Sequence, residues 1–389
     1  MIAGLLLLAL AAGEPTIEAP LEVDRWHFAG FPIASYASDV GLTLGAAVFM
    51  YAPVPEHPEE QDAVTLSASY ATRGPRQVDA GWVHQRLFGL PLRWRLNLHG
   101  GDDALMPYWG EGAQLGGLDV PTGSGTPPAP YRYHDRRFFA AATLRGPFVG
   151  AFGWHVRARF LDVGVPGQSA LLAESNPPGA HGGRVALFEA GLLFDTRDRE
   201  LSPRRGLFLA AAAFAAPQLG GVSDFSFHGY DASGRAYLPL PLGATLALRA
   251  LYDHKLPGVP GRRDAAQEVP FFERALYEGF AYGEGLGGGG TVRGVARYRI
   301  SGDEKALGNV ELRINFLSTH LFDKTQEYGV DAGLDAGWAR QPGYAAVDAA
   351  GIAAGVRLTW DHAVLIRVEM GRALSGGEET LYVSFGELF

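Results

Sequence analysis

Apolar and polar residues alternate with a period of two along much of this 389-residue chain. The segments Leu92–Leu98, Trp154–Phe160, Val310–Phe316 and Val364–Met370 place apolar residues at every second position, with mostly arginine, histidine, asparagine or glutamate between them. Successive side chains of a strand point to opposite faces, so this period predicts strands with one apolar and one polar face. The segments extend over about ten residues, which is the length of a tilted transmembrane strand.

Two architectures produce this alternation: a soluble sandwich, and a membrane barrel whose outer face meets lipid and whose inner face lines a polar lumen. The apolar faces carry tryptophan, leucine and phenylalanine on nearly every segment, and no helical segment is available to cover them. The polar faces are rich in arginine, at positions Arg93, Arg95, Arg157, Arg159, Arg313, Arg357 and Arg367. We therefore expect an all-β, antiparallel transmembrane β-barrel, because only a closed barrel of strands satisfies every backbone amide in lipid.

The turn residues between the apolar runs divide the chain into about sixteen strands, an even number that suits a bacterial single-chain barrel. Longer connections are expected at 102–135, 163–183 and 257–306, and short turns alternate with them, as outer loops alternate with periplasmic turns. The expected strands begin near Phe31, Val40, Ala63, Gln77, Pro91, Arg136, Phe152, Arg184, Gly206, Phe225, Ala244, Leu307, Glu327, Gly351, Ala363 and Thr380.

Both ends of the chain indicate export to the bacterial outer membrane. Residues 1–13 contain a short apolar core followed by small residues, which predicts a signal peptide. Residues 14–30 are expected to form a short periplasmic segment, and residues 31–389 the barrel. At the other end, Leu381, Val383, Phe385 and the terminal Phe389 share one face. This pattern resembles the signal by which outer-membrane barrels are recognised for assembly.

Composition excludes several classes of function. The chain has no cysteine, which excludes disulfides, thiolate zinc sites and thiol nucleophiles. Its net charge of −9 argues against a nucleic-acid partner. The eleven histidines are scattered, with no HExxH or GxSxG motif, so an outer-membrane hydrolase is a weak alternative. We expect no enzymatic activity, no catalytic residue, no metal and no cofactor.

The stretch GGGGTVRGVARYRI, residues 287–300, allows two interpretations. Gly283, Gly285 and Gly288 match GxGxxG, but a phosphate site needs a following helix, and the next clear element is a strand. The alternative is a loop that folds into the lumen and carries the buried charge of Arg293, which then needs carboxylates. Alternation places Glu311 and Asp331 on the lumen faces of the next two strands. We therefore predict a lumen charge cluster of Arg293, Glu311 and Asp331.

The chain resembles the BamA/TamA-type surface-antigen barrel superfamily in several motifs. Val292 and Gly294 flank Arg293 as in the family's inward-folded loop, although Val295 replaces the aromatic residue that usually follows. The resemblance implies sixteen strands and a tip arginine that pairs with acidic residues of the next two strands. The supporting segments are Asp195–Asp198, Pro203–Gly206, Gly308–Glu311, Asp331–Gly333 and, near the start, Pro32–Tyr36. With no room for POTRA domains between Gly13 and Phe31, a barrel-only member is expected.

The resemblance implies a role in inserting or transporting proteins or lipids at the outer membrane, through a seam between the first and last strands. Pro32 in the first strand and Gly386 in the last would weaken pairing there. The expected partners are outer-membrane lipids, with client outer-membrane proteins or a periplasmic or lipoprotein subunit. Arg293, Glu311 and Asp331 would then be structural or gating residues. The leading alternative is a passive, porin-like channel for small solutes, and a surface-antigen or structural role is a further one.

Overall fold

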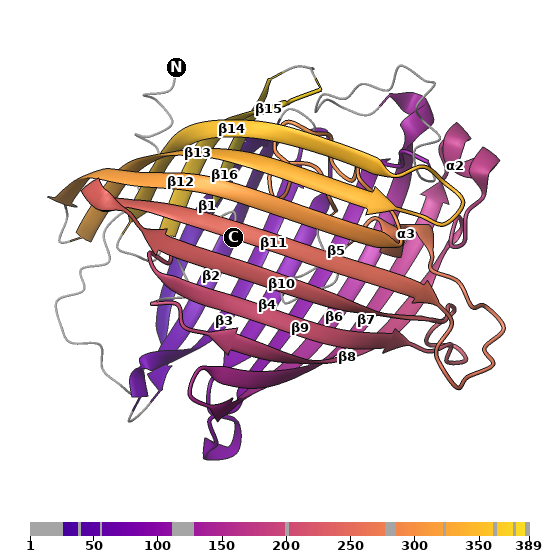
Figure 1. Cartoon of the computed structure of the whole chain (residues 1–389), viewed down its shortest axis with the longest axis horizontal. Helices are drawn as coiled ribbons and strands as arrows, with labels where there is room; N and C mark the ends of the chain where they lie inside the picture. Colours follow the sequence, from indigo (N-terminus) through magenta and orange to yellow (C-terminus); the bar gives the residue numbers. More distant parts are fainter. Residues whose placement is uncertain are drawn as a thin grey trace.

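The described residues of the computed structural model form one closed antiparallel barrel of sixteen strands (Figure 1). They are residues 26–37, 40–54, 57–110, 128–198, 202–276, 285–321, 324–360, 364–375 and 379–385. Each strand pairs with its neighbours in sequence, and β1 meets β16. The strands are β1 (His27–Ala37), β2 (Gly41–Val54), β3 (His57–Ala71), β4 (Arg76–His84), β5 (Arg93–Pro107), β6 (Arg132–Val149), β7 (Phe152–Gly167), β8 (Gly182–Asp195), β9 (Gly206–Ala216), β10 (Phe227–Pro239), β11 (Ala244–Pro257), β12 (Glu304–Leu321), β13 (Lys324–Arg340), β14 (Val347–Trp360), β15 (Val364–Ala373) and β16 (Thr380–Phe385).

The expected strand number and antiparallel barrel are confirmed, and the main differences lie at strand ends. β1 begins at His27, four residues before the predicted start, because its pairing with β2 continues to His27 opposite Tyr51. The barrel therefore includes the last residues of the segment 14–30 that was expected to precede it. The predicted signal peptide, residues 1–13, lies outside the described residues.

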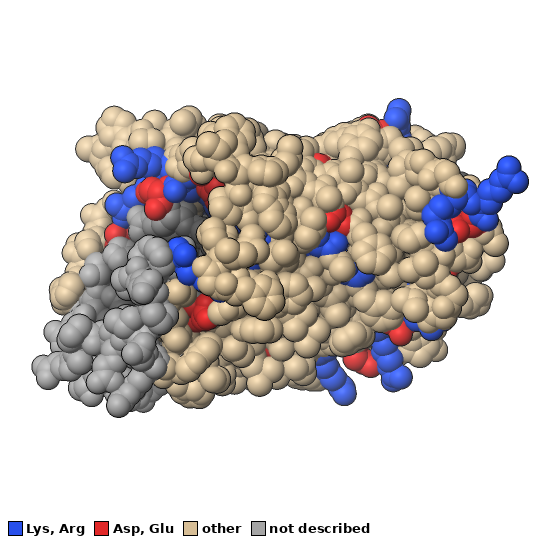
Figure 2. Space-filling model, turned by 90° about the horizontal axis from the view of Figure 1, so that it is seen from below, with Lys and Arg blue, Asp and Glu red and all other residues tan. Residues whose placement is uncertain are grey.

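Burial follows the predicted alternation. On β12, Glu311 and Arg313 point into the lumen and are buried, whereas Leu312 between them is 37% exposed on the outer face. Val356 of β14 is likewise exposed on the outer face. The face seen in Figure 2 is covered mainly by residues other than Lys, Arg, Asp and Glu, and charged residues appear in small groups at its right-hand end, its upper left, its lower edge and near its middle. A mainly apolar outer surface around a charged lumen is what a barrel in lipid requires.

The long connections gather at one end of the barrel, with the short helices α2 (Ala170–Ser175) and α3 (Phe271–Arg274) (Figure 1). At the short-turn end, the β8–β9 turn reaches strands of another part of the wall. Arg204 of this turn binds Glu327 of β13 at 2.7 Å, and Ser202 accepts a hydrogen bond from Arg357 of β14. Among the described residues, no helix has the length and apolar character to cross a membrane.

In the part of the chain that the structure describes, the contact between the first and last strands is the weakest in the wall. In the described residues, β1 and β16 share one register pair, Ala37 opposite Tyr382. By comparison, β1 shares eleven pairs with β2, and β15 shares six with β16. The barrel is therefore closed by much less backbone pairing at this position than at its neighbours.

Candidate functional site

The connection between β11 and β12 returns into the barrel, and its second half packs against the lumen wall. Leu286, Val292, Val295 and Ile300 are all at most 2% exposed. They form an apolar cluster with wall residues Leu251, Leu307, Ala339 and Ala373. Val295, which stands where the resemblance implied an aromatic residue, fills this cluster. The segment is thus held in the lumen partly by burial of apolar side chains.

Arg293 lies at the tip of this loop, fully buried, and contacts three carboxylates from three strands. Its Nε and Nη2 donate to the two oxygens of Asp335 on β13, at 2.7 and 2.9 Å. Its Nη1 donates to Glu311 on β12 at 2.9 Å and to Glu369 on β15. The backbone N–H of Arg293 also donates to Asp335, at 3.1 Å. The fork of the guanidinium thus ties the tip to three positions of the wall at once.

The cluster is stable as a charged group because each charge has partners of opposite sign. Burial disfavours the charged guanidinium, but Asp335, Glu369 and Glu311 more than compensate and raise the pKa of Arg293 above its ordinary value. Two further arginines share the carboxylates. Arg313 donates to Glu311 at 2.7 Å, and Arg367 lies 3.2 Å from Glu369. A buried network of this kind is costly to break by removing one member.

Glu311 binds Arg293, as predicted. Asp331 does not bind Arg293, and Asp335 of the same strand binds it instead. Asp331 lies opposite Arg313 and is buried, and its carboxylate makes no hydrogen bond to any described residue. The reason is register. Val292 of the loop lies beside Gly337, and the backbone N–H of Arg293 binds Asp335. Nε and Nη2 therefore bind Asp335, and only Nη1 reaches Glu311 and Glu369. Alternation alone made Asp331 and Asp335 equivalent.

Glycines form the surface on which the tip rests. Gly294 has φ +85° and a Cβ there would lie 2.3 Å from the backbone of Arg372, so only glycine fits. On the wall, a Cβ at Gly333 would meet the Arg293 guanidinium at 2.3 Å, and one at Gly351 would meet its carbonyl oxygen at 2.0 Å. A Cβ at Gly371 would lie 2.8 Å from the Gly294 nitrogen. Three adjacent strands, β13 to β15, therefore each leave out a side chain beneath the loop.

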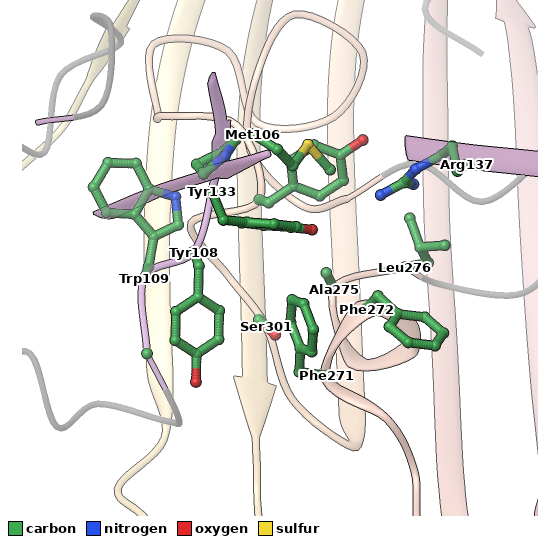
Figure 3. Close-up of a pocket in the computed structure, with 13 residues that line it drawn as sticks. Met106, Tyr108, Trp109, Tyr133, Arg137, Phe271, Phe272, Ala275, Leu276 and Ser301 are labelled. Carbon is green, nitrogen blue, oxygen red and sulfur yellow. The ribbon is translucent and has the colours of Figure 1, made fainter. Parts of the chain in front are cut away.

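The first half of the connection is anchored to a different part of the wall. Phe271 and Phe272 of α3 pack among Tyr108, Tyr133 and Phe225. Figure 3 shows both phenylalanines and the two tyrosines around one small cavity. The helix also carries a buried ion pair, in which Arg159 of β7 donates to Glu273 at 2.7 Å. Lys255 of β11 donates to the carbonyl of Leu276 at 2.8 Å. The connection thus reaches from the β6–β7 wall to the β12–β15 wall.

Sequence reasoning missed four participants of these anchors: Asp335, Glu369, Glu273 and Tyr382. Asp335 and Glu369 were on predicted lumen faces, so alternation indicated their direction, although it could not indicate the distance to Arg293. Tyr382 accepts a hydrogen bond from the backbone N–H of Gly294 at 3.0 Å. Glu273 and Tyr382 carried no usable signal, because their partners Arg159 and Gly294 are 114 and 88 residues away in the chain. In the described part of the chain, no group of three or more His, Asp and Glu is placed to hold a metal ion. Gly283 of the GxGxxG match lies outside the described residues.

Comparison with known proteins agrees with this geometry. The family model described as the Omp85 superfamily domain matches residues 184–379, which is half of the chain. The chain belongs to the Omp85 superfamily. The match includes the β8–β9 turn, the inward loop, and every carboxylate that binds Arg293. As an Omp85 barrel, the protein is placed in the bacterial outer membrane, in a superfamily of assembly and transport barrels. A search of curated proteins gave no match.

Solved structures show the same fold at low sequence identity. CdiB from Escherichia coli matches with a TM-score of 0.60 and 15% identity over 93% of this chain. BamA from Haemophilus ducreyi lacking POTRA domains 1–3 matches with a TM-score of 0.56 and 15% identity, also over 93%. CdiB from Acinetobacter baumannii gives 0.51 and 13% over the same share. This Omp85 chain spans 62%, 70% and 59% of those three chains, in that order.

Proposed function

We propose that this Omp85 barrel inserts or transports proteins or lipids at the outer membrane through a seam between β1 and β16. The observation that carries the proposal is the single register pair between these strands in the described residues. An unpaired strand edge is a template for another strand, so a seam that separates would offer backbone donors and acceptors to an incoming chain.

The composition of β1 supports a seam that opens. Pro32 lies in the middle of β1 and lacks an amide N–H, so it cannot donate a ladder hydrogen bond. Pairing of β1 with β2 nevertheless continues through Pro32 opposite Ala46. β1 is therefore paired over its whole length with β2 and, among the described residues, at one position with β16, so it can separate from β16 while it stays bound to β2.

The inward loop supports transport along the seam rather than free diffusion through the lumen. Its two halves are anchored on separate parts of the wall, by Glu273 on Arg159 and by Arg293 on Asp335, Glu311 and Glu369. We propose that the Arg293 cluster keeps this loop docked and the lumen closed to solutes. A passive channel would instead need a wide and stable aqueous path.

A reversible cross-link of the seam tests the proposal. The chain has no cysteine, so introduced pairs react alone. Tyr36 and Val383 lie one register step from the Ala37–Tyr382 pair, and Tyr36→Cys/Val383→Cys would join β1 to β16. Val356→Cys/Val368→Cys, at a register pair of β14 and β15, provides the matched control. Both variants would be placed in liposomes and given an unfolded outer-membrane barrel protein as client.

We expect oxidation of the seam pair to stop client insertion and a reductant to restore it, while the control pair has no effect. Equal insertion with the seam locked and unlocked would reject the seam. A large, steady single-channel conductance that Arg293→Ala leaves unchanged would reject the closed lumen and make a passive channel the better answer.

A further inference from the structure

We propose that Tyr382 couples the loop tip to the seam, so that docking of Arg293 favours a closed seam and release of the tip favours an open one. This inference rests on the proposed function and identifies how the seam would be regulated. It assigns a positioning role to one side chain that the tip and the edge strand share.

On the loop side, the contact is specific. The hydroxyl of Tyr382 accepts a hydrogen bond from the backbone N–H of Gly294 at 3.0 Å. The ring fills space beside two glycines, since a Cβ at Gly289 would lie 2.8 Å from it and one at Gly371 would lie 3.0 Å from it. Tyr382 itself is 4% exposed. The residue next to Arg293 is therefore bound directly to β16.

On the seam side, Tyr382 is, among the residues that the structure describes, the one of β16 that pairs with β1, opposite Ala37. It also stands opposite Glu369 in the β15–β16 register, beside one of the carboxylates that bind Arg293. Glu369, Tyr382 and Ala37 thus form one row across three strands, which continues from the charge cluster to the seam. A displacement of the tip has a short and continuous path to β16.

The other tip contacts lie on strands that are paired along both edges, so a movement of the tip would displace them less. Asp335 belongs to β13 and Glu311 to β12, and each of these strands has long registers with both neighbours. Glu369 belongs to β15, which has ten register pairs with β14. Tyr382 is on a strand with six pairs on one side and one on the other. Loss of a tip contact therefore has its largest effect on strand position at Tyr382.

The experiment measures how fast an oxidant closes the Tyr36→Cys/Val383→Cys pair in the purified full-length barrel, with no client present. Tyr382→Phe removes the hydroxyl and keeps the ring, and we expect it to slow closure by roughly two- to tenfold, as for the loss of one hydrogen bond. Tyr237→Phe provides the control, because Tyr237 is a buried tyrosine on β10, six strands from β16. A difference in gel mobility between unheated and heated samples would confirm that each variant is folded.

A second variant tests the coupling itself. Arg293→Ala should also slow closure, but in the Tyr382→Phe background it should add little to the effect on the seam, although it still increases conductance. An unchanged rate in Tyr382→Phe, or an Arg293→Ala effect that adds in full, would overturn the coupling. The cross-linking rates are measured without a client, so the two proposals can fail separately. If the rates are uncoupled but the locked seam still stops insertion, only the coupling is wrong. If the rates are coupled but the locked seam does not stop insertion, only the proposed function is wrong.

Discussion

At the scale of single residues, we expect the buried charge of Arg293 to keep the loop docked. Arg293→Ala would leave three buried carboxylates without their shared partner, and breaking a buried ion pair in this way costs about 3–5 kcal/mol. We expect lower heat resistance of the folded barrel and faster proteolysis of the loop. Arg262→Ala, which removes a surface pair with Asp264, is the control and should change neither. Equal behaviour of the two variants would show that the Arg293 cluster does not hold the loop.

The two aspartates of β13 should respond differently to the same substitution. Asp335→Asn replaces a carboxylate that makes two hydrogen bonds to the guanidinium and one to the backbone of Arg293. We expect it to destabilise the barrel clearly in urea unfolding. Asp331→Asn removes a buried charge that has no hydrogen-bond partner among the described residues, so it should be neutral or stabilising. The reverse order would place Asp331, as the sequence suggested, on Arg293.

At the scale of strands, Gly333 of β13, Gly351 of β14 and Gly371 of β15 form the surface on which the loop rests. Gly351→Ala would place a Cβ 2.0 Å from the Arg293 carbonyl and should displace the tip, while the strand itself tolerates alanine. Gly308→Ala on β12 is the matched control, because a Cβ there meets no atom within 4 Å. We expect protease cleavage of the loop to accelerate in Gly351→Ala alone. Cleavage that stays equal in both would mean that the loop does not rest on Gly351.

The strands were predictable from sequence because a period of two is a local property. Glu311, Arg313 and Asp335 all point into the lumen, as alternation requires. Pairing of Arg293 with Asp335 rather than Asp331 was not predictable, since it depends on the register of β12 with β13 and on where the loop enters. The anchor formed by Glu273 and Arg159 was also not predictable, because neither residue belongs to a motif and the contact joins distant parts of the chain.

At the scale of the whole molecule, two separate anchors should both have to fail before the lumen stays open. Glu273→Gln weakens the α3 anchor, and Arg293→Ala weakens the tip. We expect each single variant to show brief openings in single-channel recordings, and the double variant to show long openings of higher conductance. Asp264→Asn, in the same connection but outside both anchors, is the control. A double variant no more conductive than either single one would show that the loss of one anchor is sufficient to open the lumen.

The contacts of the tip also set an order of events during folding. Arg293 binds Glu311, Asp335 and Glu369, which are 18, 42 and 76 residues further along the chain, and Gly294 binds Tyr382, 88 residues ahead. Contacts over such separations form late, because the intervening strands must first be paired. We therefore expect the tip to dock only after most of the strands from β12 to β16 have paired. Docking of the tip should then mark the arrival of β15 and β16, the strands that carry Glu369 and Tyr382.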